Sequence, residues 1–181
     1  MSLDKSVLKA SILQMINDGY TTVSAAANAW ADAYDIYANG TSSFAQDQST
    51  DRVTTVSKSA LASGLISAFS GTSASGAASG IESAVIAYWT GGVFGITTPP
   101  TLLDPMAISD ISAVVNNPGS GLASALLSIF GANKTDADAS ADQVATAFDT
   151  HAKTVKVLCT YLATLPSPPF ITTKTITLSV S

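Results

Sequence analysis

The last twelve residues constrain the fold most strongly, because they have the pattern of a β-strand in a chain that otherwise predicts helices. The segment "FITTKTITLSVS", residues 170–181, alternates apolar with hydroxyl-bearing side chains and is rich in β-branched residues. A strand needs partners for its backbone N–H and C=O groups. The short stretch 93–97 is the only other segment that predicts an extended conformation. We therefore expect the final strand to pair with another polypeptide by strand addition; a disordered tail is the alternative.

This C-terminal arm divides the chain into two parts. We expect a helical domain over residues 1–165 and an arm over residues 166–181 that pairs with a neighbouring subunit. Alternating positions of the arm fall on opposite faces of the strand. The residues expected to contact the partner are Phe170, Ile171, Thr173, Ile176, Leu178 and Val180.

Apolar residues at steps of three and four predict helices before the arm. The connection at 90–105 contains the densest glycine and proline usage and predicts a long irregular segment. The expected fold is therefore mainly α, a helical bundle with a long Gly/Pro-rich connection and a C-terminal extended β arm. The helices are expected near residues 3–17, 20–38, 53–69, 81–89, 106–115, 120–130 and 140–162.

Two of these helices carry stripes that are typical of helix packing. Aromatic residues recur at steps of four and three in the helix at 20–38, and a heptad-like seam runs along the helix at 140–162. We expect both stripes to form helix-packing or oligomer surface, and whether Trp30 and Trp89 lie in the core or at an interface stays open. The stripe residues are Trp30, Tyr34, Tyr37, Val144, Phe148, His151, Val155 and Leu158.

The composition favours a chain that other subunits partly cover. It is 46% hydrophobic and only 12% charged, with much of the apolar content as alanine beside serine and threonine. The net charge of −5, with Arg52 as the single arginine, argues against a sequence-reading nucleic-acid binder. Mild acidity is compatible with lining a channel through which DNA slides without binding. No run of eighteen apolar residues predicts a membrane span.

Signatures of nucleophilic catalysis are missing from the sequence. His151 is the only histidine and lies on the apolar seam, where a buried or interface histidine is expected. A Gly-x-Ser-x-Gly elbow is not found, since Ser75 stands where the second glycine would be. Cys159 is the only cysteine, so neither an intrachain disulfide nor a thiolate metal site can form. We predict no catalytic residue.

Phosphate and metal motifs fail at their essential positions. In "GTSASGAASG" the glycines are spaced as in a phosphate loop, but Ala77 and Ala78 replace the lysine and the Ser/Thr. In "DADASAD" Ala141 replaces the turn glycine of a calcium loop, and Ala147 replaces its bidentate glutamate. The aspartates there predict a helix N-terminus instead. We predict no cofactor and no metal ion.

The general character of several stretches resembles a known class of proteins. "AAANAWADAYDIYANG", "SAVIAYWTG" and "ADQVATAFDTHAKTVKV" are similar to sequences of small virion proteins from the neck of tailed bacteriophages. The resemblance spans most of residues 20–160 and is to head–tail connector or head-completion proteins. It implies a ring of identical subunits whose terminal arms clasp neighbouring rings, and it carries over no catalytic residue.

The arm, the composition and the resemblance lead to one expected function. The chain is expected to be a structural virion protein, assembled in the host cytoplasm, whose homo-oligomeric ring joins portal and tail. Its partners would be identical subunits and other virion proteins such as portal or tail components. One alternative is another phage structural role, such as a tail terminator, baseplate or capsid accessory protein. The other is a small monomeric hydrolase or binding protein.

Overall fold

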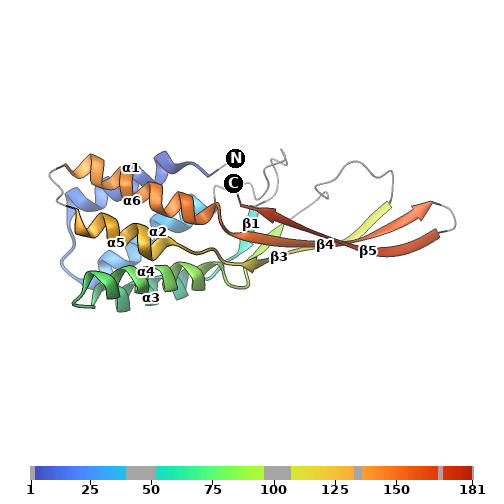
Figure 1. Ribbon diagram of the computed structural model, residues 1–181, viewed down its shortest axis with the longest axis horizontal. Helices are drawn as coiled ribbons and strands as arrows, with labels where there is room; N and C mark the ends of the chain where they lie inside the picture. Colours follow the sequence, from blue (N-terminus) through green and yellow to red (C-terminus); the bar gives the residue numbers. More distant parts are fainter. Residues whose placement is uncertain (1–2, 40–51, 96–106, 133–135, 167–168, 181) are drawn as a thin grey trace.

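The protein consists of a helical body and a β-sheet that extends from it as a narrow arm (Figure 1). The prediction of a mainly α fold with a single C-terminal strand is wrong, because five strands form one antiparallel sheet beside six helices in the described residues. The computed structural model describes residues 3–39, 52–95, 107–132, 136–166 and 169–180, with the backbone alone described at 52–55, 107–109, 164–166, 169–170 and 174.

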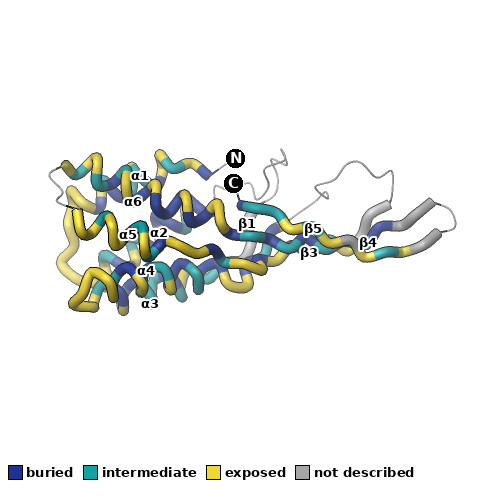
Figure 2. The backbone as a smooth tube through the Cα atoms, viewed as in Figure 1, coloured by how far each residue is buried: buried dark blue, intermediate teal, exposed yellow. Residues whose placement is uncertain are grey.

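The helices of the body form a closed cycle. Each contacts the next along the chain, and α6 returns to contact α1. Every helix of the cycle contributes buried apolar side chains to one core cluster, and the dark blue stretches of Figure 2 mark the buried residues. The helices are α1 (Lys5–Asp18), α2 (Val23–Asn39), α3 (Lys58–Phe69), α4 (Ala74–Trp89), α5 (Leu122–Gly131) and α6 (Ala137–Ala152).

Side-chain caps fix where several helices begin. Asp4 accepts a hydrogen bond from the N–H of Ser6 at the start of α1, and Asp136 accepts one from Asp138 at the start of α6. The acidic N-terminus predicted for the last long helix is therefore present. The α5 helix begins differently, because the N–H of Leu122 donates to the carboxylate of Glu82 on α4 over 2.9 Å. The single glutamate thus joins two helices.

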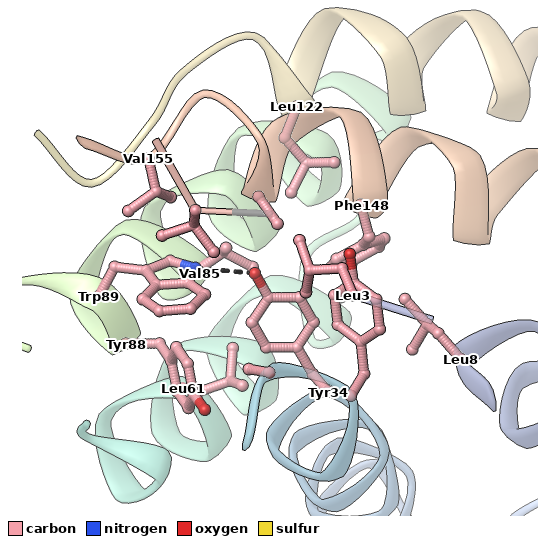
Figure 3. Packing of buried hydrophobic residues seen from close by; sticks show 14 of the residues in the cluster. Leu3, Leu8, Tyr34, Leu61, Val85, Tyr88, Trp89, Leu122, Phe148 and Val155 are labelled. Carbon is pink, nitrogen blue, oxygen red and sulfur yellow. Dashed lines mark hydrogen bonds between the residues drawn. The ribbon is translucent and has the colours of Figure 1, made fainter. Parts of the chain in front are cut away.

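Aromatic side chains fill the centre of the body (Figure 3). Tyr34 of α2 lies between Trp89 of α4 and Phe148 of α6, with ring centroids 6.4 and 5.6 Å away. The indole N–H of Trp89 donates to the hydroxyl of Tyr34 over 2.8 Å, so neither polar atom is buried without a partner. Both side chains are 1% exposed or less. This cluster joins helices that are distant in the sequence.

The sheet has the simple strand order β1-β2-β3-β4-β5, and every pairing is antiparallel. Near the body all five strands take part, whereas only β3, β4 and β5 continue into the arm (Figure 1). The strands are β1 (Arg52–Thr55), β2 (Val93–Gly95), β3 (Ala107–Asn117), β4 (Lys156–Pro166) and β5 (Pro169–Ser179).

The last helix is shorter than predicted. It ends at Ala152 rather than near residue 162, and the hydroxyl of Thr154 donates to the C=O of His151 at that end. The apolar residues beyond Ala152 fit a helical period and also a period of two. The segment forms a strand because β3 and β5 pair with it on both sides. The odd-numbered residues that become buried in β4 are Val157, Cys159, Tyr161 and Ala163.

The helix predicted at 106–115 is also wrong, because residues 107–117 form β3. Ala113 and Val115 are buried two positions apart, as on one face of a strand. Their apolar neighbours Ile111 and Val114 produced the steps of three and four that imitate a helix. The extended stretch predicted at 93–97 is represented by β2, and its last two residues lie outside the described part of the chain.

The predicted C-terminal strand is present, but the premise that it has no partner strand within its own chain is wrong. Residues 169–179 form β5, which pairs with β4 of the same chain from Lys156↔Ser179 to Pro166↔Pro169. The premise that the final residues have no internal partner fails because the partner strand was itself predicted to be helical.

Candidate assembly interface

The β5 strand lies at one edge of the sheet, with β4 on one side and no second strand among the described residues on the other. Its register with β4 runs through eleven consecutive pairs without a shift. Beyond them, the N–H of Val180 donates to the C=O of Val155 over 3.2 Å and continues the same register. The register of β5 on β4 is therefore fixed along its whole length.

The outer edge of β5 presents the backbone groups of every second residue. In an antiparallel pair, residues that bond to the partner alternate with residues whose N–H and C=O point away from it. The bond from Val180 to Val155 places the even-numbered residues in the first group. The residues whose backbone groups point outward are therefore Ile171, Thr173, Thr175, Thr177 and Ser179.

The side chains of β5 differ between its two faces. Ile176 and Leu178 contact the core and are partly buried, and Val180 is 1% exposed. Thr173 is exposed on the opposite face, and Ile171 is 71% exposed. The two faces predicted for the arm are thus present, while the side chain of Phe170 lies outside the described part of the structure.

The other edges of the sheet are less regular. The β1 strand has four residues and a register shift between Val53 and Thr55. The β3 strand shifts between Ser109 and Ser112, where Asp110 has a φ of 52°. Shifts of this kind bend a strand and interrupt its ladder. Among the described strands, β5 offers the longest regular edge.

The predicted helix-packing residues lie inside the body or at its junction with the sheet. Tyr34, Tyr37, Phe148 and Val155 are buried, and Trp30 is partly buried against the rings of Phe69 and Phe148. Trp89 is fully buried. Val144 is partly buried on α6, whereas Leu158 lies on β4 and is partly buried there.

A small apolar groove opens beside the partly buried members of this set. It has a volume of about 160 Å³ and is bordered by side chains of five helices. Its lining is almost entirely apolar, which is typical of a surface that contacts another apolar surface. The lining residues are Trp30, Leu65, Phe69, Ile81, Leu126, Phe130, Val144 and Phe148.

A buried carboxylate joins α2 to α6. Asp149 is 8% exposed and accepts a hydrogen bond from the hydroxyl of Tyr37 over 2.8 Å. It also pairs with the ammonium of Lys153 over 2.7 Å, so its charge is compensated. Burial, with the nearby carboxylate as a second cause, raises the pKa of Tyr37, and this hydroxyl stays protonated as a donor. These contacts of Asp149 hold α2 and the end of α6 together.

His151 borders a larger groove between α5 and α6. This groove has a volume of about 710 Å³, and Asp142 and Thr150 also line it. The histidine itself is 2% exposed, and neither ring nitrogen has a hydrogen-bond partner among the described residues. Burial lowers the pKa of His151, and Glu82 opposes this effect, so the ring is neutral at pH 7.

Within the described part of the chain, the surroundings of His151 do not form a catalytic triad. Its ring lies against Gly119, which has a φ of +90° and where a Cβ atom, if the residue carried one, would lie 3.0 Å from Nε2. Because no described serine or aspartate bonds to the ring nitrogens, no described group is placed to transfer a proton through them. The arrangement fixes the loop that precedes α5 against the end of α6.

The described residues were compared with the requirements of a metal site and of a membrane-spanning helix. They contain no group of three His, Cys, Asp or Glu side chains arranged to hold a metal ion. None of the described helices combines the length and apolar character that crossing a bilayer needs. Comparisons with protein-family models, curated proteins and solved structures give no match to this chain.

The sequence did not predict β4, the strand whose pairing with β5 makes the candidate interface regular. Val157, Cys159 and Tyr161 of β4 hold the inner side of β5 in place. Their signal was a period of two over 155–163, with β-branched and aromatic residues at several positions. The same window also fits a period near 3.5 through Val155, Leu158 and Leu162, so the pattern alone could not separate the two structures.

Proposed function

We propose that this chain is a structural virion protein that forms a ring in the neck of a tailed bacteriophage, joining portal and tail. The observation that supports this most is the division into a self-contained helical body and a projecting arm with an unpaired regular edge (Figure 1). Such an edge binds further strands by main-chain hydrogen bonds. The resemblance of residues 20–160 to neck proteins supplies the biological setting.

The body supplies surface for contacts around the ring. Ile36 on α2 is 61% exposed, and Leu127 and Phe130 on α5 are 44% and 42% exposed. Phe130 also borders the small apolar groove, so exposed apolar side chains and an apolar recess occur on one body. Ring closure requires two different, complementary surfaces on each subunit. These features are suited to that kind of contact.

The arm then reaches a neighbour outside the ring contact. Because β4 already orders β5, binding a further strand does not require the arm to fold first. Each backbone hydrogen bond then contributes a net ~0.5–1.5 kcal/mol to binding, and no conformational entropy of β5 has to be lost against it. Many copies around a ring multiply this contribution through effective concentration.

Electron microscopy of virions that contain the chain tests the proposal directly. The expected result is a ring of this fold between portal and tail. Density in a baseplate, tail terminator or capsid shell would establish the alternative structural role. Light scattering of the purified chain addresses the remaining alternative, since a monomeric protein with a measurable hydrolytic activity would contradict an assembly function.

A further inference from the structure

We infer that β5 pairs with β5 of a second copy of this chain, antiparallel and centred on Thr175. This deepens the proposed function, because it names the arm's neighbour as an identical subunit. The ribbon β3-β4-β5 of one copy would continue directly into β5-β4-β3 of the other. Four properties of the edge support this pairing.

The first property is that the edge carries few of the devices that normally prevent strand addition, with Lys174 as the one charge along it. Natural edge strands are short, bulged, interrupted by proline or densely charged. Between residues 170 and 179 β5 contains no proline and a single charged residue, Lys174. Its register with β4 is unshifted over the whole length. An edge of this kind is expected to be covered in the functional state.

The second property is self-complementarity in one register. Pairing centred on Thr175 brings Thr175 opposite Thr175 of the second copy, and Thr173 opposite Thr177. All five residues with outward backbone groups then find partners, which gives about ten hydrogen bonds at two for each pair. Opposed threonines are favourable cross-strand pairs. The third pairing in this register brings Ile171 opposite Ser179.

The third property is charge. A register centred on Lys174 would place two lysines directly opposite each other, and such like-charge pairs destabilise a sheet. In the register centred on Thr175, position 174 lies opposite Ile176 instead. Shifting the centre by two residues in either direction leaves outward groups at the ends without partners. The register centred on Thr175 is therefore favoured by both hydrogen bonding and charge.

The fourth property is the irregularity of the other edges. Pairing β5 with β3 or β1 of another copy would meet the register shift near Asp110 or the short β1. A two-fold β5 contact closes after two copies, so it does not itself build a ring. In the proposed assembly it links a subunit of one ring to a subunit of a facing ring.

Cysteine cross-linking of the full chain tests the register. Thr175→Cys is compared with Thr173→Cys and Thr177→Cys, since all three side chains are exposed on the same face. With a mild oxidant we expect Thr175→Cys to form a covalent dimer at least tenfold faster than the other two. The wild-type chain is the blank, because its one thiol, Cys159, is buried. Equal rates for the three variants would overturn the inference.

A charge pair provides a second test that does not depend on disulfide geometry. In the inferred register Thr173→Lys with Thr177→Glu places opposite charges across the dimer, whereas Thr173→Glu with Thr177→Glu places like charges there. We expect the dimer dissociation constant to be at least tenfold lower for the first variant. Equal constants, or a monomeric wild-type chain at millimolar concentration, would contradict β5 pairing.

The outcomes separate this inference from the proposed function. Rings at the neck without Thr175 cross-links would leave the function standing and overturn the self-pairing. Cross-linked dimers from a chain located elsewhere in the virion would support the self-pairing and overturn the proposed function. Thr175→Pro serves as a blocking variant, with Thr175→Ala as its control, because only proline removes an outward N–H. We expect dimers with alanine and monomers with proline.

Discussion

The body and the arm differ in how their polar backbone groups are paired. In the body each helix pairs its own backbone, and the helices then bury apolar faces against two neighbours. In the arm β5 depends on β4 for half of its backbone groups and leaves the other half directed outward. The helices of the body therefore pair their backbone groups within one chain, whereas the outward backbone groups of β5 can still bind another strand. Assembly is expected to depend on the arm's edge.

The largest expected effect comes from breaking the body at its centre. Trp89→Ala should lower the free energy of unfolding by about 3–5 kcal/mol, because it removes a fully buried ring and leaves the hydroxyl of Tyr34 without its donor. Urea unfolding measures the change. Ile36→Ala, at a side chain 61% exposed, is the control and should change stability by less than about 0.5 kcal/mol. A loss below about 1 kcal/mol at Trp89 would contradict the role given to the aromatic cluster.

The next effect compares the two sides of β5. Ile176→Pro removes an N–H that bonds to β4 and should lower the free energy of unfolding by roughly 1–3 kcal/mol. Thr175→Pro removes an outward N–H and should have a smaller effect on the isolated subunit. Thermal unfolding of both variants under monomeric conditions makes the comparison. Equal losses would show that the inward and outward positions have been assigned wrongly.

A smaller effect concerns the pH dependence of the body. The lowered pKa of His151 means that the folded chain binds fewer protons there than the unfolded chain. The free energy of unfolding should therefore fall as the pH decreases below about 6.5, by at most about 1.4 kcal/mol per unit. Urea unfolding between pH 7.5 and 5.5 measures this slope. His151→Leu should remove it, and an unchanged slope in that variant would assign it to other groups.

The smallest effect is expected at the exposed face of the arm. Ile171→Ser, at a side chain 71% exposed, should change the free energy of unfolding by less than about 0.5 kcal/mol. Ile176→Ser, on the face that contacts the core, should lower it by roughly 1–3 kcal/mol. Thermal unfolding of the two variants shows whether the faces differ as described. Similar losses at both positions would mean that the arm is buried on both faces.

The sequence predicted the body better than the arm. The helices near 3–17, 20–38 and 120–130 were predicted because their apolar spacing is local and a glycine follows each pattern, namely Gly19, Gly40 and Gly131. The final strand was predicted because its alternation has no competing helical period. These elements needed no knowledge of what they contact.

The strands β3 and β4 were missed because their apolar residues satisfy two periods. Around β4 the set Val155, Leu158 and Leu162 predicts a helix, and the set Val157, Cys159 and Tyr161 predicts a strand. Pairing on both sides decides between them, and those pairings join residues far apart in the sequence. The C-terminal strand was therefore predicted on the correct segment, whereas its pairing with β4 and its position at the edge could be seen only from the whole sheet.

Amide hydrogen exchange along β5, resolved residue by residue, tests the central claim most directly. In the isolated subunit we expect slow exchange at Thr172, Ile176 and Leu178, and fast exchange at Thr173, Thr175 and Thr177. In the assembled protein the second group should become as slow as the first. If those outward amides still exchange fast after assembly, the edge of β5 binds nothing, and this account of the protein is contradicted.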